Sequence, residues 1–92
     1  MNQRQKDKIK FYMVQVTYYS YENLSIDWVN VHHFRTKSEA IKFISKEIVE
    51  PYKDIVEHFK EETELTTKHG YTYRLEEITL WIKNRRINFI EQ

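Results

Sequence analysis

The chain has 92 residues, of which 40% are hydrophobic and 32% are charged, and its formal net charge is +1. This length suits one domain, and this composition is typical of a folded protein with a solvated surface. The absence of cysteine excludes disulfides, thiolate metal sites and cysteine nucleophiles, and a single glycine excludes phosphate-binding loops. Since no apolar stretch could cross a bilayer and no secretory leader opens the chain, we expect a cytoplasmic protein.

Charge is balanced overall but unevenly distributed. Residues 1–10 and 83–92 are basic, whereas residues 39–64 are acidic. A balanced total argues against a dedicated binder of the nucleic-acid backbone, which usually has a strongly basic domain. We interpret residues 1–9 as a basic flexible leader and residues 10–92 as a single α+β domain.

The first half of the domain predicts two paired strands. Residues 10–21 are rich in Tyr and Val and contain no Gly, Pro, Asp or Asn, which is typical of a strand. Residues 22–25 favour a turn, and residues 26–35 predict a second strand. The two strands would form an antiparallel hairpin.

A helix is expected next, because Thr36 and Glu39 have the spacing of a capping box. Apolar side chains then recur at steps of three and four residues, at Ile41, Ile44, Ile48, Tyr52, Ile55 and Phe59. Pro51 interrupts this stripe without changing its register. The pattern therefore predicts either one kinked helix or two helices with Pro51 in the first turn of the second.

The last third of the chain is less clearly patterned. Gly70 favours a helix end in the left-handed conformation, after a helix that could stop anywhere from 62 to 69. Residues 71–82 predict a third strand, with a bulge at Glu76–Glu77 because the apolar positions change phase there. Residues 87–90 predict a short fourth strand, although residues 74–90 fit a helix almost as well. The expected fold is ββαββ, an antiparallel sheet with one kinked helix across one face.

The uncovered face of this sheet suggests a binding surface. One helix covers only one face of an open sheet, here over Val14, Val16, Val29 and Val31. A second face rich in large apolar side chains is normally covered by another subunit or another protein. The predicted partner-binding residues are Phe11, Tyr19, Tyr21, Trp28 and Phe34, with Met13 on the same face. We therefore expect either a homodimer or a complex with another protein.

No arrangement for catalysis or metal binding is evident. His32 and His33 are neighbours on a strand and point to opposite faces, and His58 and His69 form no helical ligand pair. No serine lies in a strained strand-to-helix turn, and no pair of carboxylates is set for acid–base work. We expect a protein that is not an enzyme and has no metal or cofactor.

Nucleic-acid binding is the alternative function. Tyrosines on a sheet can stack on bases, and nearby cations can contact phosphates. The candidate cations are Lys8, Lys10, Arg35, Lys83, Arg85 and Arg86. Residues 33–40 resemble the strand-to-helix junction in the arm-binding domain of tyrosine integrases, over roughly a tenth of the chain. The basic, glycine-containing turn of that family is replaced here by residues 22–25, so the resemblance assigns no family.

The leading hypothesis is a small, non-enzymatic protein that acts by binding another protein. Tyr, Trp and Arg, which are enriched at binding hot spots, are frequent in the chain. The chain is small, lacks a catalytic set and favours Phe, Tyr, Met, Ile, Asn and Lys, which have AT-rich codons. In these respects it resembles the small accessory proteins of phages and mobile elements. That group includes inhibitors of host defence systems such as CRISPR nucleases. The sequence leaves the identity of the partner open.

Overall fold

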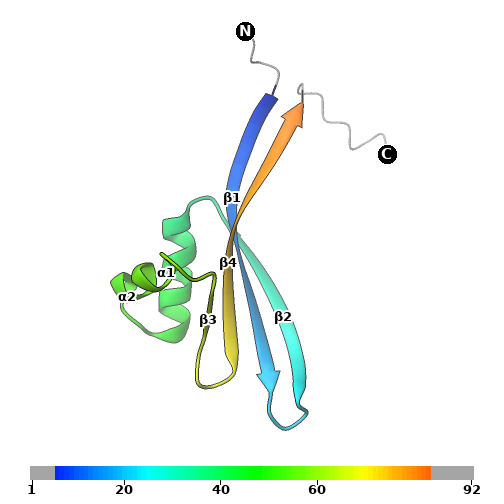
Figure 1. Cartoon of the computed structure of the whole chain (residues 1–92), viewed down its shortest axis with the longest axis vertical. Coiled ribbons are helices and arrows are strands. Elements are labelled where there is room, and N and C mark those ends of the chain that lie inside the picture. The colour runs from blue at the N-terminus through cyan, green and yellow to red at the C-terminus, as the bar shows by residue number, and fades with distance from the viewer. Residues whose placement is uncertain (1–5, 84–92) are drawn as a thin grey trace.

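The structure is a computed structural model that describes residues 6–83, which form four strands and two helices (Figure 1). The elements are β1 (Lys6–Ser20), β2 (Ser25–Phe34), α1 (Lys37–Ile48), α2 (Tyr52–His58), β3 (Glu64–Thr66) and β4 (Tyr71–Lys83). The predicted small α+β domain with an antiparallel sheet is confirmed.

The four strands form one sheet in the order β2-β1-β4-β3, and every neighbouring pair is antiparallel. β1 and β4 are its two central strands, and they pair continuously from Lys6 opposite Lys83 to Tyr18 opposite Tyr71. β1 begins at Lys6, so residues 6–9 of the predicted leader belong to the sheet.

The predicted helix start is confirmed by its cap. Thr36 has an extended backbone, and its Oγ1 accepts a hydrogen bond from the backbone N–H of Glu39 at 3.1 Å. This contact satisfies one of the N–H groups that the first helical turn leaves without a partner. The sequence therefore defines the β2–α1 boundary through a local hydrogen bond.

Two helices, rather than one kinked helix, follow this cap. α1 ends where Val49 adopts the left-handed conformation, with φ of 57°, and its N–H donates to the carbonyl of Ser45. Pro51 then occupies the N-cap of α2, one position before the first turn. Proline is tolerated there because its missing N–H would have no intrahelical partner. The two-helix alternative is confirmed, and the single kinked helix is wrong.

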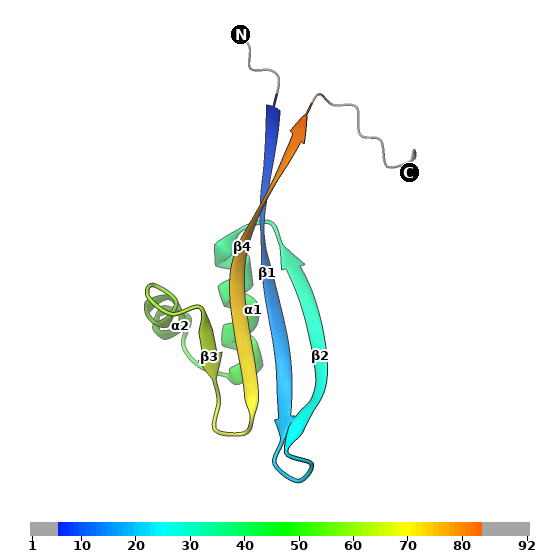
Figure 2. The same cartoon turned by 45° about the vertical axis from the view of Figure 1, so that its right-hand side comes forward.

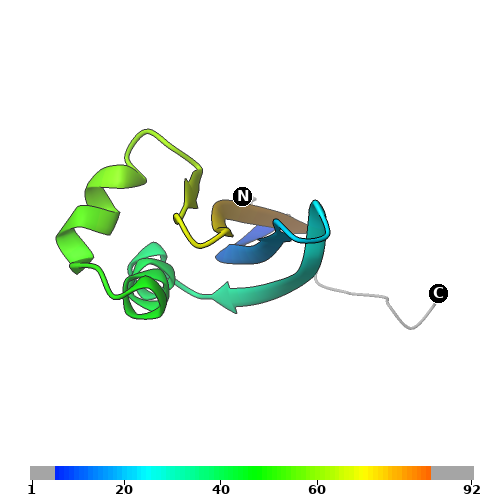
Figure 3. The ribbon, with the colours of Figure 1, turned by 90° about the horizontal axis from the view of Figure 1, so that it is seen from below.

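The core lies between the two helices and one face of the sheet. Val14 of β1 and Ile44 of α1 are completely buried. The other buried core side chains are Val16, Ala40, Ile41, Ile55, Phe59, Tyr73 and Leu75. Seen from below, both helices lie to one side of the strands (Figure 3). We call the sheet face that packs on them the helix face, and the opposite one the open face.

The segment after α2 differs from the prediction, since it forms a hairpin. β3 pairs with β4, and the connecting turn contains Gly70, whose φ is +96°. Gly70 thus has the expected positive φ, but in a hairpin turn rather than at a helix end. β3 was not predicted, because three residues are too few to show the alternation of a strand.

β4 confirms the predicted third strand, and the alternative helix is wrong for residues 74–83. The predicted bulge at Glu76–Glu77 is also wrong, because the β1–β4 register runs unbroken past both residues. The predicted strand at residues 87–90 lies outside the described residues. The change of apolar phase at Glu76 therefore has another cause, which the surface described below explains.

The β1–β4 pair extends well beyond the helices, in a molecule that measures 53 × 33 × 19 Å (Figures 1 and 2). The pairing of β2 with β1 stops at Tyr12, and that of β3 with β4 stops at Arg74. Residues 6–11 and 78–83 consequently pair only with one another in the described chain. We call this two-stranded part of the sheet the ribbon.

Candidate protein-binding surface

The pairing of β1 with β2 corrects the predicted faces of β2. Trp28 lies opposite Tyr18 and Phe34 lies opposite Tyr12, and residues directly opposite share a face. The ring of Trp28 stacks on that of Tyr18, and the ring of Phe34 contacts Phe43 of α1. Trp28 and Phe34 therefore lie on the helix face, not on the open face as predicted.

The same error affects Val29 and Val31, which were predicted to lie under the helix. They lie opposite Thr17 and Gln15 on the open face, where 49% and 47% of their surfaces are exposed, and no helix covers them. β2 carries apolar side chains in both phases, and a shift of one residue moves every side chain to the other face. The pairing also contains an irregularity near Tyr18 and Tyr19, which the sequence pattern does not reveal.

Three of the predicted residues remain on or beside the open face. Phe11 lies opposite Ile78, and its ring meets that of His33 at a centroid distance of 5.6 Å. Tyr19 lies opposite Ile26 and contacts the ring of Tyr21, which begins the β1–β2 turn and is largely exposed. The positions of Phe11 and Tyr19 agree with the prediction, while their role in binding stays a prediction.

The ribbon is amphipathic across its two faces. Ile9 lies opposite Leu80, next to the Phe11–Ile78 pair, so four apolar side chains follow one another on the open face. Ile9 and Leu80 are 46% and 50% exposed. We call this set, Ile9, Phe11, Ile78 and Leu80, the apolar stripe.

The opposite face of the ribbon is mainly polar and charged. Lys10 forms an ion pair with Glu77 at 3.4 Å, and it lies opposite Thr79. Lys8 Nζ lies over the exposed ring of Trp81, 5.4 Å from its centroid. The apolar stripe is therefore the side of the ribbon on which burial would gain the most.

The apolar stripe explains the change of phase that looked like a bulge. In the lower half of β4, Tyr73 and Leu75 are buried on the helix face. In the ribbon the aliphatic residues Ile78 and Leu80 of β4 lie on the open face, and Trp81 lies on the opposite face with Lys8. The apolar side of the strand thus changes just where the helices stop covering the sheet.

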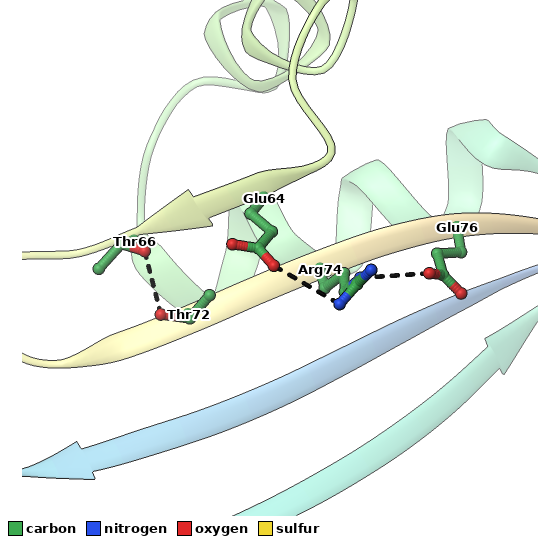
Figure 4. Close-up of polar contacts among 5 residues, drawn as sticks. All are labelled: Glu64, Thr66, Thr72, Arg74 and Glu76. Carbon is green, nitrogen blue, oxygen red and sulfur yellow. Dashed lines mark hydrogen bonds and ion pairs between the residues drawn. The ribbon is translucent and has the colours of Figure 1, made fainter. Parts of the chain in front are cut away.

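The rest of the open face is divided between apolar and polar side chains. Ile26, Val29 and Val31 expose about half of their surfaces on β2. On β3 and β4, Arg74 forms ion pairs with Glu64 at 3.7 Å and Glu76 at 3.2 Å (Figure 4). The hydroxyls of Thr66 and Thr72 lie 3.0 Å apart on the same strands. The apolar part of the open face therefore follows the ribbon and β2.

The predicted nucleic-acid contacts are only partly brought together. Lys8 and Lys10 share one face of the ribbon, and Lys83 is placed by its pairing with Lys6 at the ribbon end. Arg35 is exposed and follows β2 directly. Arg85 and Arg86 lie outside the described residues.

The histidines make separate contacts. His32 packs against the ring of Phe43, His33 against Phe11, and His58 Nε2 lies 2.6 Å from the carbonyl oxygen of Glu64. Among residues 6–83, no group of three or more His, Asp or Glu side chains is placed to hold a metal ion.

None of the helices in the described part of the chain is long and apolar enough to cross a membrane. In comparisons with known proteins, no family model, no curated protein and no solved structure matches the chain.

Proposed function

We propose that the protein is a small, non-enzymatic module that binds another protein through the open face of its sheet. The contact would be centred on the apolar stripe and continue along β2 to Val31 and Val29. The observation that carries this proposal is the change of apolar side in β4, from Leu75 on the helix face to Ile78 and Leu80 on the open face. These apolar residues of the ribbon thus lie on a face of the sheet that residues 6–83 leave uncovered.

Energetics support a protein as the occupant. A two-stranded ribbon alone is marginally stable in water, and it gains stability when its apolar face packs on something. Burial contributes roughly 25 cal/mol for each Å² of apolar surface removed from water. Ile9 and Leu80 each still expose about half of their surface, so this gain is available. A nucleic-acid backbone offers mainly phosphates, which the apolar stripe cannot complement.

A second copy of the chain is the simplest such occupant. A two-fold interface brings the same patch of both subunits together, so the patch must be complementary to itself. The apolar stripe itself carries no charge, and the charged residues of β3 and β4 on the open face, Arg74, Glu64 and Glu76, are joined in ion pairs. Two ribbons could therefore pack stripe against stripe without burying a charged residue of the stripe.

An unlike protein could use the same surface. By analogy with small accessory proteins of phages and mobile elements, the proposed partner is a component of a host defence system, such as a CRISPR nuclease. This part of the proposal rests on small size, AT-rich codon usage and the absence of a recognisable catalytic set in the sequence. It is tested by capturing proteins from the native host with the tagged full chain.

The informative control in that capture is a pair of variants at neighbouring positions. Leu80→Glu places a charge in the apolar stripe, whereas Thr79→Glu places the same charge on the opposite face of β4. A specific partner should be lost with Leu80→Glu and retained with Thr79→Glu. Retention by both variants would contradict binding through the stripe.

Nucleic-acid binding is the second candidate, favoured by the position of lysines on the ribbon. Lys8 and Lys10 share a face, and two-stranded ribbons fit the DNA major groove. The ion pair of Lys10 with Glu77 weakens this candidate, because it reduces the charge offered to phosphate. Binding of duplex and single-stranded DNA at increasing salt separates the two functions. A phosphate-driven complex weakens steeply with salt and with Lys8→Ala, whereas a complex held by apolar contacts through the stripe does not.

A further inference from the structure

A groove lies on the helix face of the molecule, away from the apolar stripe. Its volume is about 890 Å³, and it is lined by residues from β2, α1, α2 and the β3–β4 hairpin. Volumes of this size are typical of sites for small ligands or for side chains of a partner. Three aromatic side chains, Trp28, Tyr71 and Tyr73, and three carboxylates, Glu47, Glu50 and Asp54, contribute to its lining.

The aromatic wall is held in place by ring contacts. Tyr18 stacks beneath Trp28, with ring centroids 5.9 Å apart, and it also contacts Tyr71 at 4.9 Å. Trp28 and Tyr71 contact each other at 5.9 Å. Trp28 nevertheless keeps 39% of its surface exposed. The groove thus offers an ordered, accessible aromatic surface, with the buried ring of Tyr73 beside it.

The carboxylates give this groove a negative charge. Glu47 lies in the last turn of α1, where the helix dipole adds a partial negative charge, and Glu50 lies in the link between α1 and α2. Across residues 6–83, no ion pair involves Glu47, Glu50 or Asp54. The basic groups that line the same groove are Lys68 and two histidines, His58 and His69.

We propose that this groove binds an organic cation, through an alkylammonium or guanidinium group. The negative faces of aromatic rings attract such cations, and carboxylates at the rim add charge-assisted hydrogen bonds. Three acids against one lysine disfavour an anion, and a cation adds ion pairs that a neutral ligand cannot make. The group could belong to a free amine or to an arginine or lysine side chain of a protein. This site is separate from the open face and does not depend on it.

Nuclear magnetic resonance of the isotopically labelled full chain tests the proposal. Acetyl-arginine amide is titrated against the backbone amide signals, with neutral acetyl-glutamine amide as the control probe. Saturable shifts are expected at the groove, for instance at Tyr71, Asp54 and Trp28, with the arginine probe only. An arginine–glycine peptide that binds more tightly than acetyl-arginine amide identifies a protein side chain as the source. Equal affinities identify a free cation.

Matched variants locate the binding. Glu50→Gln with Asp54→Asn should weaken affinity for acetyl-arginine amide about fivefold or more. Glu57→Gln with Glu61→Gln removes the same charge from positions that do not line the groove, and should leave affinity unchanged. Trp28→Leu should weaken binding, while Trp81→Leu should not.

Three results would overturn the proposal. These are the absence of saturable shifts with the arginine probe, shifts centred away from the groove, and equal effects of the two acid-to-amide pairs. If Trp28→Leu disturbs the fold, the exposed Glu50 and Asp54 still decide the question, because their replacement removes no buried contact.

Discussion

The indole ring of Trp28 stacks on the phenol ring of Tyr18 across the β1–β2 pair, with centroids 5.9 Å apart and planes 16° from parallel. The register of β1 with β2 that brings these rings together also determines which side of β2 faces the helices. It places Trp28 in the groove beside α1 and α2, and it leaves Val29 and Val31 on the open face. The molecule therefore has two separate candidate surfaces, an aromatic groove and an apolar ribbon.

The cap of α1 should contribute measurably to stability. Thr36→Ala removes the oxygen that accepts from the N–H of Glu39, and it should cost about 1 kcal/mol of unfolding free energy. Thr36→Ser retains that oxygen and should cost much less. Glu39→Ala should also cost less than Thr36→Ala, because the hydrogen bond to Thr36 is donated by the backbone N–H of residue 39, which the substitution retains. Denaturant unfolding measures all three, and a silent Thr36→Ala would show that the contact is not formed in solution.

Gly70 should not tolerate a side chain. Its φ is +96°, and a Cβ added there would meet the carbonyl oxygen of Tyr19 at 2.9 Å. The N–H of Tyr19 donates to the carbonyl of Gly70, so relief of this clash would disturb that hydrogen bond. Gly70→Ala should lower the free energy of unfolding by about 1–3 kcal/mol. His69→Ala, at the exposed neighbouring position, should have a far smaller effect, and equal losses would refute the explanation.

Tyr73 should make stability depend on alkaline pH. Burial raises the pKa of Tyr73 from the ordinary 10.0 to about 12, and the nearby carboxylate of Glu47 and Tyr71 add to this shift. The neutral phenol is therefore favoured in the folded state. Its contribution is fully present below pH 10.0 and is lost as the pH rises to about 12. The shift corresponds to about 2–3 kcal/mol.

Tyr73→Phe provides the comparison for this pH dependence. The variant should lack one late-ionising tyrosine in an absorbance titration. Its unfolding free energy should fall less than that of the natural protein between pH 10 and about 12. Parallel profiles of the two proteins over this range would contradict the raised pKa of Tyr73.

The elements that could be predicted from the sequence are those with local signals. The hydroxyl of Thr36 and the position of Glu39 define the start of α1 without reference to the rest of the fold. The Tyr- and Val-rich pattern of β1 likewise identifies a strand by its composition. Such signals depend only on residues that are close in the chain, so the elements they predict are found in the structure.

The candidate surfaces could not be predicted in full, because they depend on pairing between distant segments. β2 has apolar residues in both phases, so only its register with β1 places Trp28 opposite Tyr18. A phase change at Glu76 fits a bulge or a change of covered face equally well, and only the unbroken register of β4 with β1 decides between them. The groove requires β2 and the short β3 to be brought beside α2, which no local pattern indicates. The sequence does contain one usable signal for the groove. Tyr18 and Trp28 lie at similar distances from the β1–β2 turn, which is compatible with their pairing across the two strands.

Sedimentation of the full chain over a range of concentrations tests most directly whether the apolar stripe is a protein-binding surface. We predict that the natural protein is a dimer that dissociates only at low concentration. Leu80→Glu introduces a charge into the stripe, so this variant should have a much higher dimer dissociation constant. Thr79→Glu, which adds the same charge on the opposite face of β4, should leave the dimer intact. A natural protein that stays monomeric at the highest concentration, or a dimer that Leu80→Glu does not weaken, would contradict self-association through the stripe.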